Sequence, residues 1–144
     1  MKKYKIGYTT GVYDMFHIGH LNILRRAKEQ CDYLIVGVST DELALSYKKK
    51  TPVIPFQERK AIVEAIKYVD QVVPQTSMDK LAAWQELHFD VIFHGDDWKG
   101  TPMYQDIENK LKSVGCELVF LPHTQGTSST LLQQSLSKSV AEKE

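Results

Sequence analysis

The sequence predicts one α/β domain built on a parallel β-sheet with helices on both faces. Two observations lead to this expectation. Short apolar runs alternate with stretches of helical periodicity along the chain, which is the order of elements in a parallel sheet whose strands are connected by helices. The 144 residues suffice for one domain with a full core and fall short of two ordinary domains. We expect a single domain over residues 1–144, with a core within about 4–136 and a polar C-terminal tail.

Five apolar runs have the length and residue types of β-strands, being rich in Val, Ile, Tyr and Phe. They are residues 5–9, 33–38, 69–73, 91–94 and 118–121. Four stretches between them place apolar side chains three and four residues apart, as one face of a helix requires. These are residues 21–29, 58–66 (through Ile62, Ala65 and Ile66), 79–87 and 106–114. The pattern is typical of a doubly wound, Rossmann-like domain with a five-stranded sheet, whose ligand site lies at the carboxyl ends of the strands.

The longest irregular segment, residues 46–55, holds Lys48, Lys49, Lys50 and two prolines. Three adjacent lysines usually form a solvated surface, but long loops in a compact domain often carry function. This segment follows the second expected strand, so it lies at the same edge of the sheet as the loop after the first strand. A cationic loop at that edge could close over a phosphate ligand.

Charge and composition exclude several classes of protein. Lys plus Arg and Asp plus Glu both number 18, whereas an extended nucleic-acid surface needs a basic excess. No run approaches the roughly 20 apolar residues that cross a membrane, and none follows the charged start as a signal peptide requires. Cys31 and Cys116 are isolated and lack metal-ligand spacing, so we expect two small buried thiols. These features predict a cytoplasmic protein without nucleic-acid or membrane partners.

The residues between the first strand and the first helix suit phosphate chemistry. Gly11 and Gly19 let the backbone approach a ligand closely. A helix that begins near His20 directs free amide groups and the positive end of its dipole at the same place. His17 and His20 add imidazole donors, which suit the charge that develops in phosphoryl transfer. A histidine pair could instead bind a metal, but no third ligand is close in sequence. Chance is a further alternative for so short a motif, and its position after the first strand argues against it.

Residues 11–20 read G-V-Y-D-M-F-H-I-G-H, and this resembles the signature of the HxGH nucleotidyltransferase superfamily. Residues 27–42 are similar to its cytidylyltransferase branch, in particular to the glycerol-3-phosphate cytidylyltransferases, and the likeness extends from about residue 5 to residue 134. The resemblance implies transfer of CMP from CTP to a small phosphorylated alcohol, most readily glycerol 3-phosphate, with CDP-glycerol and pyrophosphate as products. It also implies Mg²⁺ held through the triphosphate rather than by a protein cage, and a homodimer.

The resemblance assigns roles to residues around the histidine loop. His17 and His20 would stabilise the α- and β-phosphates in the transition state, and Asp14 would orient a phosphate or the metal. The remaining nucleotide-site residues of this loop are Thr10, Gly11, Val12 and Gly19. In related enzymes a lysine of the loop after the second strand contacts the phosphates; Lys48 falls nearest that position, with Lys49 and Lys50 as alternatives.

Two further basic residues are assigned to the substrate. Arg59, which follows Glu58, resembles the family's E-R segment and would offer a fork-shaped donor to phosphate. Without the resemblance, Arg59 would be interpreted as a surface residue paired with Glu58 or Glu64. Lys67 stands where glycerol-phosphate enzymes more often have arginine and ethanolamine-phosphate enzymes can have lysine.

Two more segments resemble family motifs. Gly95-Asp96-Asp97-Trp98 is typical of the glycerol-3-phosphate enzymes, and it implies that Gly95, Asp96 and Asp97 lie against the nucleotide, where oxygen acceptors suit the amine of cytosine. Trp98 would cover the acceptor or only pack, and the whole segment could be a plain turn with a helix cap. Residues 122–130 resemble R-T-E-G-I-S-T-T, with His123 and Gln125 in place of the arginine and the glutamate.

Gly126, Thr127 and Ser128 would bind phosphate at a helix N-terminus, although Ser128 alone could be a simple cap. His123 would contact the substrate with a charge that depends on pH. Three alternatives stay open from the sequence. The acceptor could be ethanolamine or choline phosphate, the reaction could be adenylyl transfer to another phosphate, or the domain could be a noncatalytic nucleotide sensor.

Overall fold

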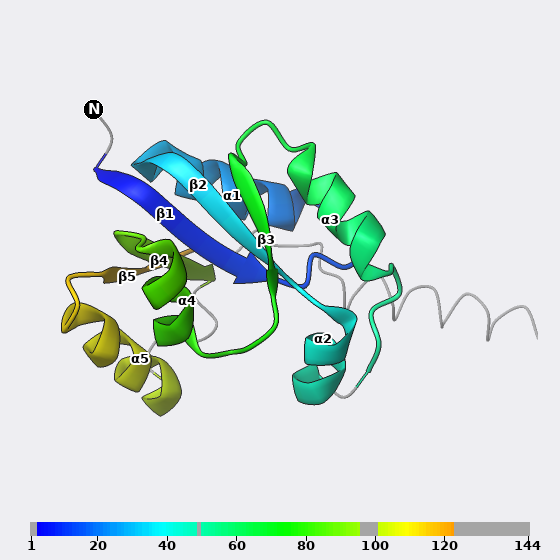
Figure 1. Ribbon diagram of the computed structural model, residues 1–144. Helices are drawn as coiled ribbons and strands as arrows, with labels where there is room; N and C mark the ends of the chain where they lie inside the picture. The colour runs from blue at the N-terminus through cyan, green and yellow to red at the C-terminus, as the bar shows by residue number, and fades with distance from the viewer. Residues whose placement is uncertain (1–2, 49, 96–100, 123–144) are drawn as a thin grey trace, which may run out of the picture.

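Five parallel strands form one sheet in the order β3-β2-β1-β4-β5 (Figure 1). The computed structural model describes residues 3–48, 50–95 and 101–122. The elements follow one another as β1 (Tyr4–Gly11), α1 (Ile18–Gln30), β2 (Cys31–Ser39), α2 (Asp41–Lys48), α3 (Phe56–Glu64), β3 (Gln71–Gln75), α4 (Lys80–Leu87), β4 (Val91–Gly95), α5 (Pro102–Lys112) and β5 (Glu117–Leu121). The expected α/β class and five-stranded parallel sheet are confirmed, and each expected strand overlaps an observed one.

The strand order reverses beside the central strand β1. From β1 the chain builds outward through β2 and β3, then crosses back to place β4 and β5 on the other side. Because all pairings are parallel, the carboxyl ends of the strands lie at one edge of the sheet. The point of reversal, between β1 and β4 at that edge, is where open sheets of this kind bind their ligands.

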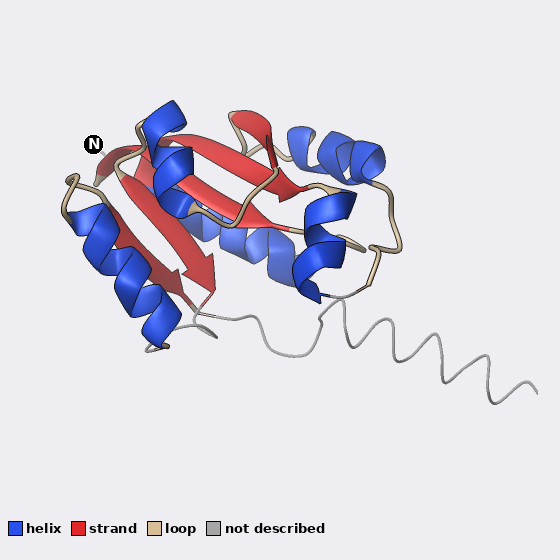
Figure 2. Cartoon of the chain, turned by 60° about the horizontal axis from the view of Figure 1, so that its bottom comes forward, coloured by secondary structure: helices blue, strands red, loops and turns tan. Residues whose placement is uncertain are grey.

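Helices cover both faces of the sheet (Figure 2). On one face, Leu24 of α1 and Val63 of α3 join Val36 and Phe93 of the sheet in one fully buried cluster. On the other face, the second cluster holds Leu111 of α5, with Trp84 of α4 packed against its edge. Alternate residues of the central strands point into the two clusters, which explains why these strands are continuous apolar runs in the sequence.

Two expectations about helices are wrong in detail. The sequence does not predict α2, whose last residues, 46–48, fall in the segment expected to be irregular. It has only eight residues, and Ala44 alone is buried among those whose side chains the structure describes, which gives little periodicity to detect. In α3 the buried face carries Arg59 and Val63, whereas Ile62, expected to face the core, is 43% exposed. Among the described residues, no helix has both the length and the apolar character that a membrane crossing demands.

Candidate active site

The loop from β1 to α1 holds a strained backbone. Tyr13 and Met15 adopt φ values of 55° and 49°, in the left-handed region that residues with a side chain rarely occupy. Tyr13 is buried, and its ring meets that of Phe16 at 6.2 Å. Packing of these aromatic side chains holds the strained turn in place, and strain of this kind concentrates at binding and catalytic sites.

His17 ends this loop as the N-cap of α1, which begins at Ile18 rather than near His20. The Gly19 amide donates to Nδ1 of His17 at 3.0 Å, and the His17 amide donates to Nδ1 of His20 at 3.3 Å. The two histidines therefore form a capping box, in which each ring satisfies a backbone amide of the first turn. The two rings stack with centroids 4.0 Å apart.

This hydrogen bonding fixes where the protons of the two rings lie. A nitrogen that accepts a hydrogen bond carries no proton, so each neutral ring has its proton on Nε2. Burial lowers the pKa of His17 and so favours its neutral form. The loop thus offers two oriented Nε2–H donors together with the N-terminus of α1, a combination suited to phosphate oxygens.

Lys80 is a site residue that sequence reasoning missed. It is the first residue of α4 and is only 3% exposed, and its Nζ donates to Oγ1 of Thr10 at 2.9 Å. Burial lowers the pKa of Lys80 to about 8. Thr10 is one residue before the end of β1, so a buried ammonium stands at the carboxyl edge close to the histidine loop. The sequence shows only a lysine at a helix start, which is typical of a solvated residue.

A buried histidine lies near Lys80. His94 in β4 is 7% exposed, and its ring meets that of Tyr104 edge to face at 4.9 Å. Within the described part of the chain its Nε2 has no hydrogen-bond partner. Burial first, and the charge of Lys80 second, lower the pKa of His94 to about 3. His94 is therefore neutral throughout the physiological range.

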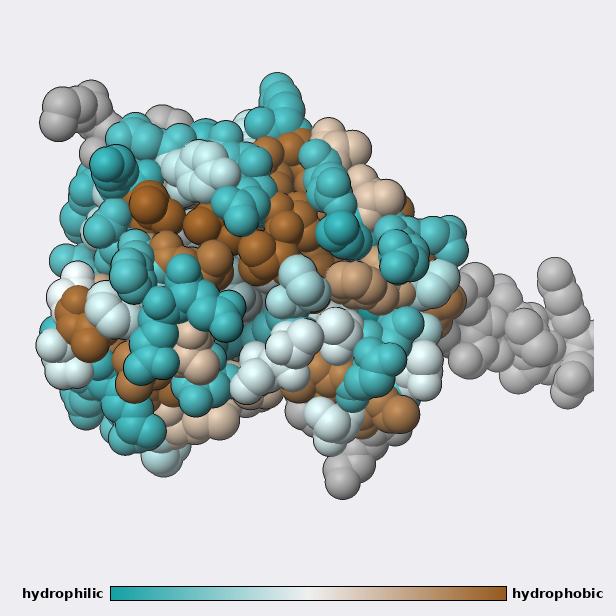
Figure 3. Space-filling view, in the orientation of Figure 1, coloured by the Kyte–Doolittle hydropathy of each residue, from teal (hydrophilic) through white to brown (hydrophobic). Residues whose placement is uncertain are grey.

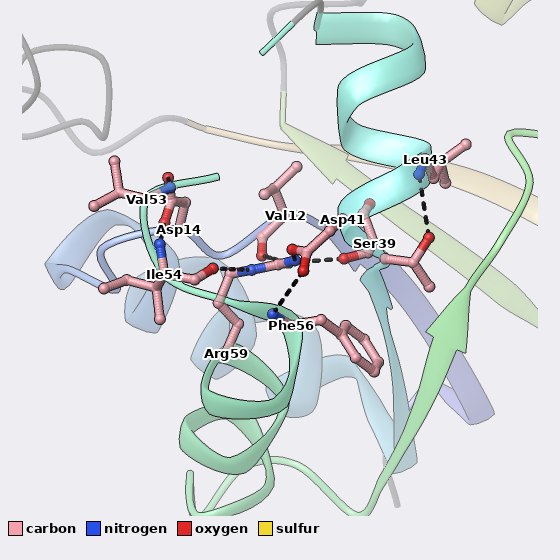
Figure 4. Close-up of polar contacts among 10 residues, drawn as sticks. Val12, Asp14, Ser39, Asp41, Leu43, Val53, Ile54, Phe56 and Arg59 are labelled. Carbon is pink, nitrogen blue, oxygen red and sulfur yellow. Dashed lines mark hydrogen bonds and ion pairs between the residues drawn. The ribbon is translucent and has the colours of Figure 1, made fainter. Parts of the chain in front are cut away.

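Arg59 does not lie where phosphate could reach it, which corrects its expected role as a substrate ligand. The side chain is 1% exposed, and its guanidinium donates four hydrogen bonds to protein oxygens (Figure 4). The acceptors are the carbonyls of Ile54, Val12 and Ser39 and the carboxylate of Asp41. The alternative of a surface pair with Glu58 or Glu64 is also wrong, because the ion pair is with Asp41 at 2.6 Å.

Asp14 makes contacts within the protein that the sequence did not predict. It is buried, and its two carboxylate oxygens each accept a backbone amide, Val53 N and Ile54 N, both at 2.8 Å. In this arrangement the carboxylate holds the connection between α2 and α3 (Figure 4).

The other predicted residues lie in different parts of the structure, and some fall outside the described residues. Thr10, Gly11, Val12 and Gly19 lie in β1, the following loop and the first turn of α1, and Gly95 ends β4 at the same edge. Lys50 is exposed, and the backbone of Lys48 ends α2. Lys67 is exposed between α3 and β3, at the amino edge of the sheet, so one chain does not bring it near the histidines. Predictions for Lys49, Asp96, Asp97, Trp98, His123, Gly126, Thr127 and Ser128 fall outside the described residues.

A parallel sheet whose first strand leads into a histidine-capped helix is typical of nucleotide-handling α/β proteins, in which phosphate binds at such a helix N-terminus. Comparison with known proteins specifies the class further. A profile of the Cytidylyltransferase-like family matches residues 8–135. The chain belongs to this family, and it is a CTP-dependent nucleotidyltransferase.

Individual relatives agree with this placement. The glycerol-3-phosphate cytidylyltransferase of Bacillus subtilis is 36% identical over 135 residues, covering 89% of this chain and 94% of that protein. The Staphylococcus aureus enzyme of the same name is 38% identical over 129 residues, covering 89% and 92%. The ethanolamine-phosphate cytidylyltransferase of Mus musculus is 40% identical over 125 residues, which cover 83% of this chain but 30% of that protein.

Solved structures share the fold. The lipopolysaccharide core biosynthesis protein of Thermoplasma volcanium superposes with a TM-score of 0.71 at 25% identity, covering 86% of this chain and 99% of that one. Pantoate-beta-alanine ligase of Francisella tularensis gives a TM-score of 0.62 at 13% identity, covering 88% and 62%, and shows the fold alone.

Proposed function

We propose that the protein transfers CMP from CTP to glycerol 3-phosphate, yielding CDP-glycerol and pyrophosphate. The observation that carries the reaction type is the pair of Nε2–H donors fixed at the N-terminus of α1. The acceptor is supported by the two bacterial relatives of that name, which match over nearly their whole length.

In the proposed reaction, an oxygen of the acceptor phosphate attacks the α-phosphorus of CTP in line. A new P–O bond forms as the bond to the bridging oxygen of the β-phosphate breaks, and pyrophosphate leaves with that electron pair. The protein needs no covalent nucleophile, because positioning and charge stabilisation carry this chemistry. His17 and His20 would donate to the α- and β-phosphate oxygens as negative charge moves toward the leaving group.

The cationic side chains of the site would bind the two substrates. Lys80 would meet the acceptor phosphate, and an anion beside it would favour its protonated form. Lys50, or the neighbouring Lys48, would meet the triphosphate. The described residues contain no group of three or more histidine, cysteine, aspartate or glutamate side chains that could hold a metal ion. A Mg²⁺ ion bound through the triphosphate would supply further charge neutralisation.

The variant His17→Asn tests the role of the first histidine. An asparagine oxygen can replace Nδ1 as the acceptor of the N-cap bond, but no N–H takes the place of Nε2–H. We expect normal folding with turnover reduced about 10²- to 10³-fold, measured as pyrophosphate release. His17→Ala, which loses both cap and donor, is the companion variant and should fall at least as far. Near-normal turnover in His17→Asn would refute the assignment.

The identity of the acceptor needs a direct comparison. The family relative from Mus musculus and the lysine at position 67 keep ethanolamine phosphate as the second candidate. Assays of CTP and ATP with glycerol 3-phosphate, ethanolamine phosphate and choline phosphate, followed by pyrophosphate release, decide among them. We expect the highest kcat/KM for CTP with glycerol 3-phosphate. Tight CTP binding without turnover for any acceptor would favour a noncatalytic sensor.

We also propose that the enzyme works in the cytoplasm as a homodimer. A groove of about 370 Å³ between β3 and α4 is lined by Val73, Pro74, Ala82, Ala83 and Leu87 together with polar side chains at its rim. Apolar side chains gather on this side of the molecule (Figure 3), and a surface of this kind suits burial against a second copy. Light scattering should give twice the chain mass for the wild type and a lower mass for Ala82→Arg; cell fractionation tests the compartment.

A further inference from the structure

One guanidinium connects three stretches of the chain that are separated in the sequence, at residue 12, residues 39–41 and residue 54. Nη1 of Arg59 donates to the carbonyl of Val12 at 2.8 Å and to that of Ser39 at 2.7 Å, and Nη2 donates to Oδ1 of Asp41 at 2.6 Å. Nε donates to the carbonyl of Ile54 at 2.8 Å. These acceptors belong to the loop after β1, the end of β2, the start of α2 and the connection from α2 to α3 (Figure 4).

The connection from α2 to α3 is held at Ile54 from two directions. Its amide donates to Asp14 and its carbonyl accepts from Arg59, both at 2.8 Å. Val53 adds a second amide on Asp14, and the Phe56 amide donates to the other oxygen of Asp41 at 3.4 Å. Asp14 lies three residues before His17, so the same carboxylate that holds this connection belongs to the histidine loop.

Burial of an arginine is unfavourable, because its charge leaves water, unless the N–H donors of the guanidinium find acceptors in the protein. Here four of the five N–H groups of a guanidinium have protein acceptors, and one acceptor is an anion. An apolar side chain could fill the same space but could not hold three carbonyls and a carboxylate at fixed positions. The geometry therefore favours a role in specifying the arrangement of the loops around the site.

We propose that Asp14, Asp41 and Arg59 form a positioning bracket that sets the connection carrying Lys50 against the histidine loop. The bracket rests on the proposed function, in which this connection presents its lysine to the triphosphate while His17 and His20 face the α- and β-phosphates. It makes Asp14 and Arg59 positioning residues, which act on the phosphates through the segments they hold. A misplacement of about 1 Å at such a site can reduce the rate about 10²-fold.

The variants Asp14→Asn, Asp41→Asn and Arg59→Lys test the bracket. Asp14→Asn keeps one acceptor and replaces the other with a donor that faces a backbone amide, and Arg59→Lys keeps the charge but loses the fork. Each should lower kcat/KM for CTP by roughly 10- to 100-fold while CD spectra stay native. If Arg59 instead bound phosphate directly, Asp41→Asn would leave kcat/KM unchanged or raise it, because it removes a competing anion.

Asp70→Asn is the matched control. Asp70 also accepts a backbone amide, Leu34 N at 2.8 Å, and pairs with Lys28, but it lies at the amino edge of the sheet. We expect Asp70→Asn to lower the melting temperature as much as Asp14→Asn does, with kcat/KM unchanged. This comparison separates general destabilisation from loss of the bracket.

Limited trypsin digestion gives a readout that needs no substrate. Release of Val53 and Ile54 should let the connection open locally, and cleavage after Lys50, followed by mass spectrometry, should rise roughly 5- to 30-fold in Asp14→Asn and Arg59→Lys but not in Asp70→Asn. The double variant Asp14→Asn/Arg59→Lys should lose less kcat/KM than the product of the single losses, because both changes release the same peptide unit.

The outcomes distinguish the bracket from the proposed function. Increased cleavage in the variants of an enzyme that shows no cytidylyl transfer would support the bracket and refute the function. Unchanged cleavage and unchanged kcat/KM in both Asp14→Asn and Arg59→Lys would overturn the bracket and leave the function standing. Strictly multiplicative losses in the double variant would also overturn it, since the two residues would then act independently.

Discussion

Replacement of Lys80 by methionine should make the protein more stable and less active. Lys80 is 3% exposed, and among the described residues its Nζ donates one hydrogen bond, to Thr10, which replaces only part of its hydration. Methionine has a similar length and no charge, so it can fill the same space without that penalty. We therefore expect the side chain of Lys80 to reduce stability, as residues kept for function often do.

The lowered pKa of Lys80 gives the size of the expected gain in the free energy of unfolding. A change from 10.5 to about 8 corresponds to about 3.4 kcal/mol by which folding disfavours the charged form, since one pKa unit is about 1.4 kcal/mol. Loss of the Thr10 hydrogen bond offsets about 1 kcal/mol of this. We expect Lys80→Met to raise the free energy of unfolding by about 2 kcal/mol at pH 7, which is roughly 4–8 °C in melting temperature for a chain of this size.

The stability gain of Lys80→Met should decrease as the pH rises. Because the folded pKa is lowered, between about pH 8 and 10.5 the unfolded chain holds a proton that the folded protein has lost, and wild-type stability rises with pH. The advantage of Lys80→Met should thus shrink by about 2 kcal/mol between pH 7 and pH 9.5. Urea unfolding at both pH values measures it, with pyrophosphate release as the activity assay. A variant that is destabilised at pH 7, or a stability difference independent of pH, would refute the reasoning.

Substitutions at two further positions inside the fold should change stability in predictable ways. His94 has its pKa lowered to about 3, so below about pH 6.5 the unfolded chain binds a proton that the folded protein refuses; His94→Met should remove about 2 kcal/mol of the stability loss between pH 7 and pH 5 in urea unfolding. Persistence of the full loss in the variant would contradict this. A Cβ on Gly37 would meet the buried Tyr8 hydroxyl at 2.5 Å and Thr10 Cγ2 at 3.1 Å, so Gly37→Ala should lower the free energy of unfolding by about 1–3 kcal/mol. A thermal melt unchanged from wild type would show that Tyr8 can move aside.

The strands could be predicted from the sequence because each is a run of apolar residues that the sheet buries on both faces. Val91, Ile92 and Phe93 are fully buried, and an apolar run this short is too short for a helix, so it predicts a strand. The histidine loop could be predicted too, since its residues are contiguous and follow a strand. These features are local, and local patterns survive in the sequence.

The environments of single charged residues could not be predicted. Arg59 and Val63 are four apart and share the buried face of α3, but the apolar Ile62, Ala65 and Ile66 suggest a different face. The burial of Arg59 depends on carbonyls from Val12 and Ser39, 47 and 20 residues away in the sequence. Lys80 is buried for a similar reason, through Thr10, 70 residues away. Only the assembled tertiary structure supplies these partners.

The distribution of charge at the site bears on how catalysis works. The charge of Arg59 faces protein oxygens, and burial lowers the pKa values of His17 and Lys80, which disfavours positive charge on these two side chains. Neutral Nε2–H donors and the amides of α1 bind ground-state phosphate only moderately, but they interact more strongly as charge moves onto the leaving pyrophosphate. Fixed donors therefore favour the transition state, whereas the exposed Lys50 and a metal ion that arrives with CTP would neutralise the substrate on binding. On this argument, loss of the Nε2–H of His17 should lower kcat far more than it raises KM for CTP, and loss of the Lys50 ammonium should do the reverse.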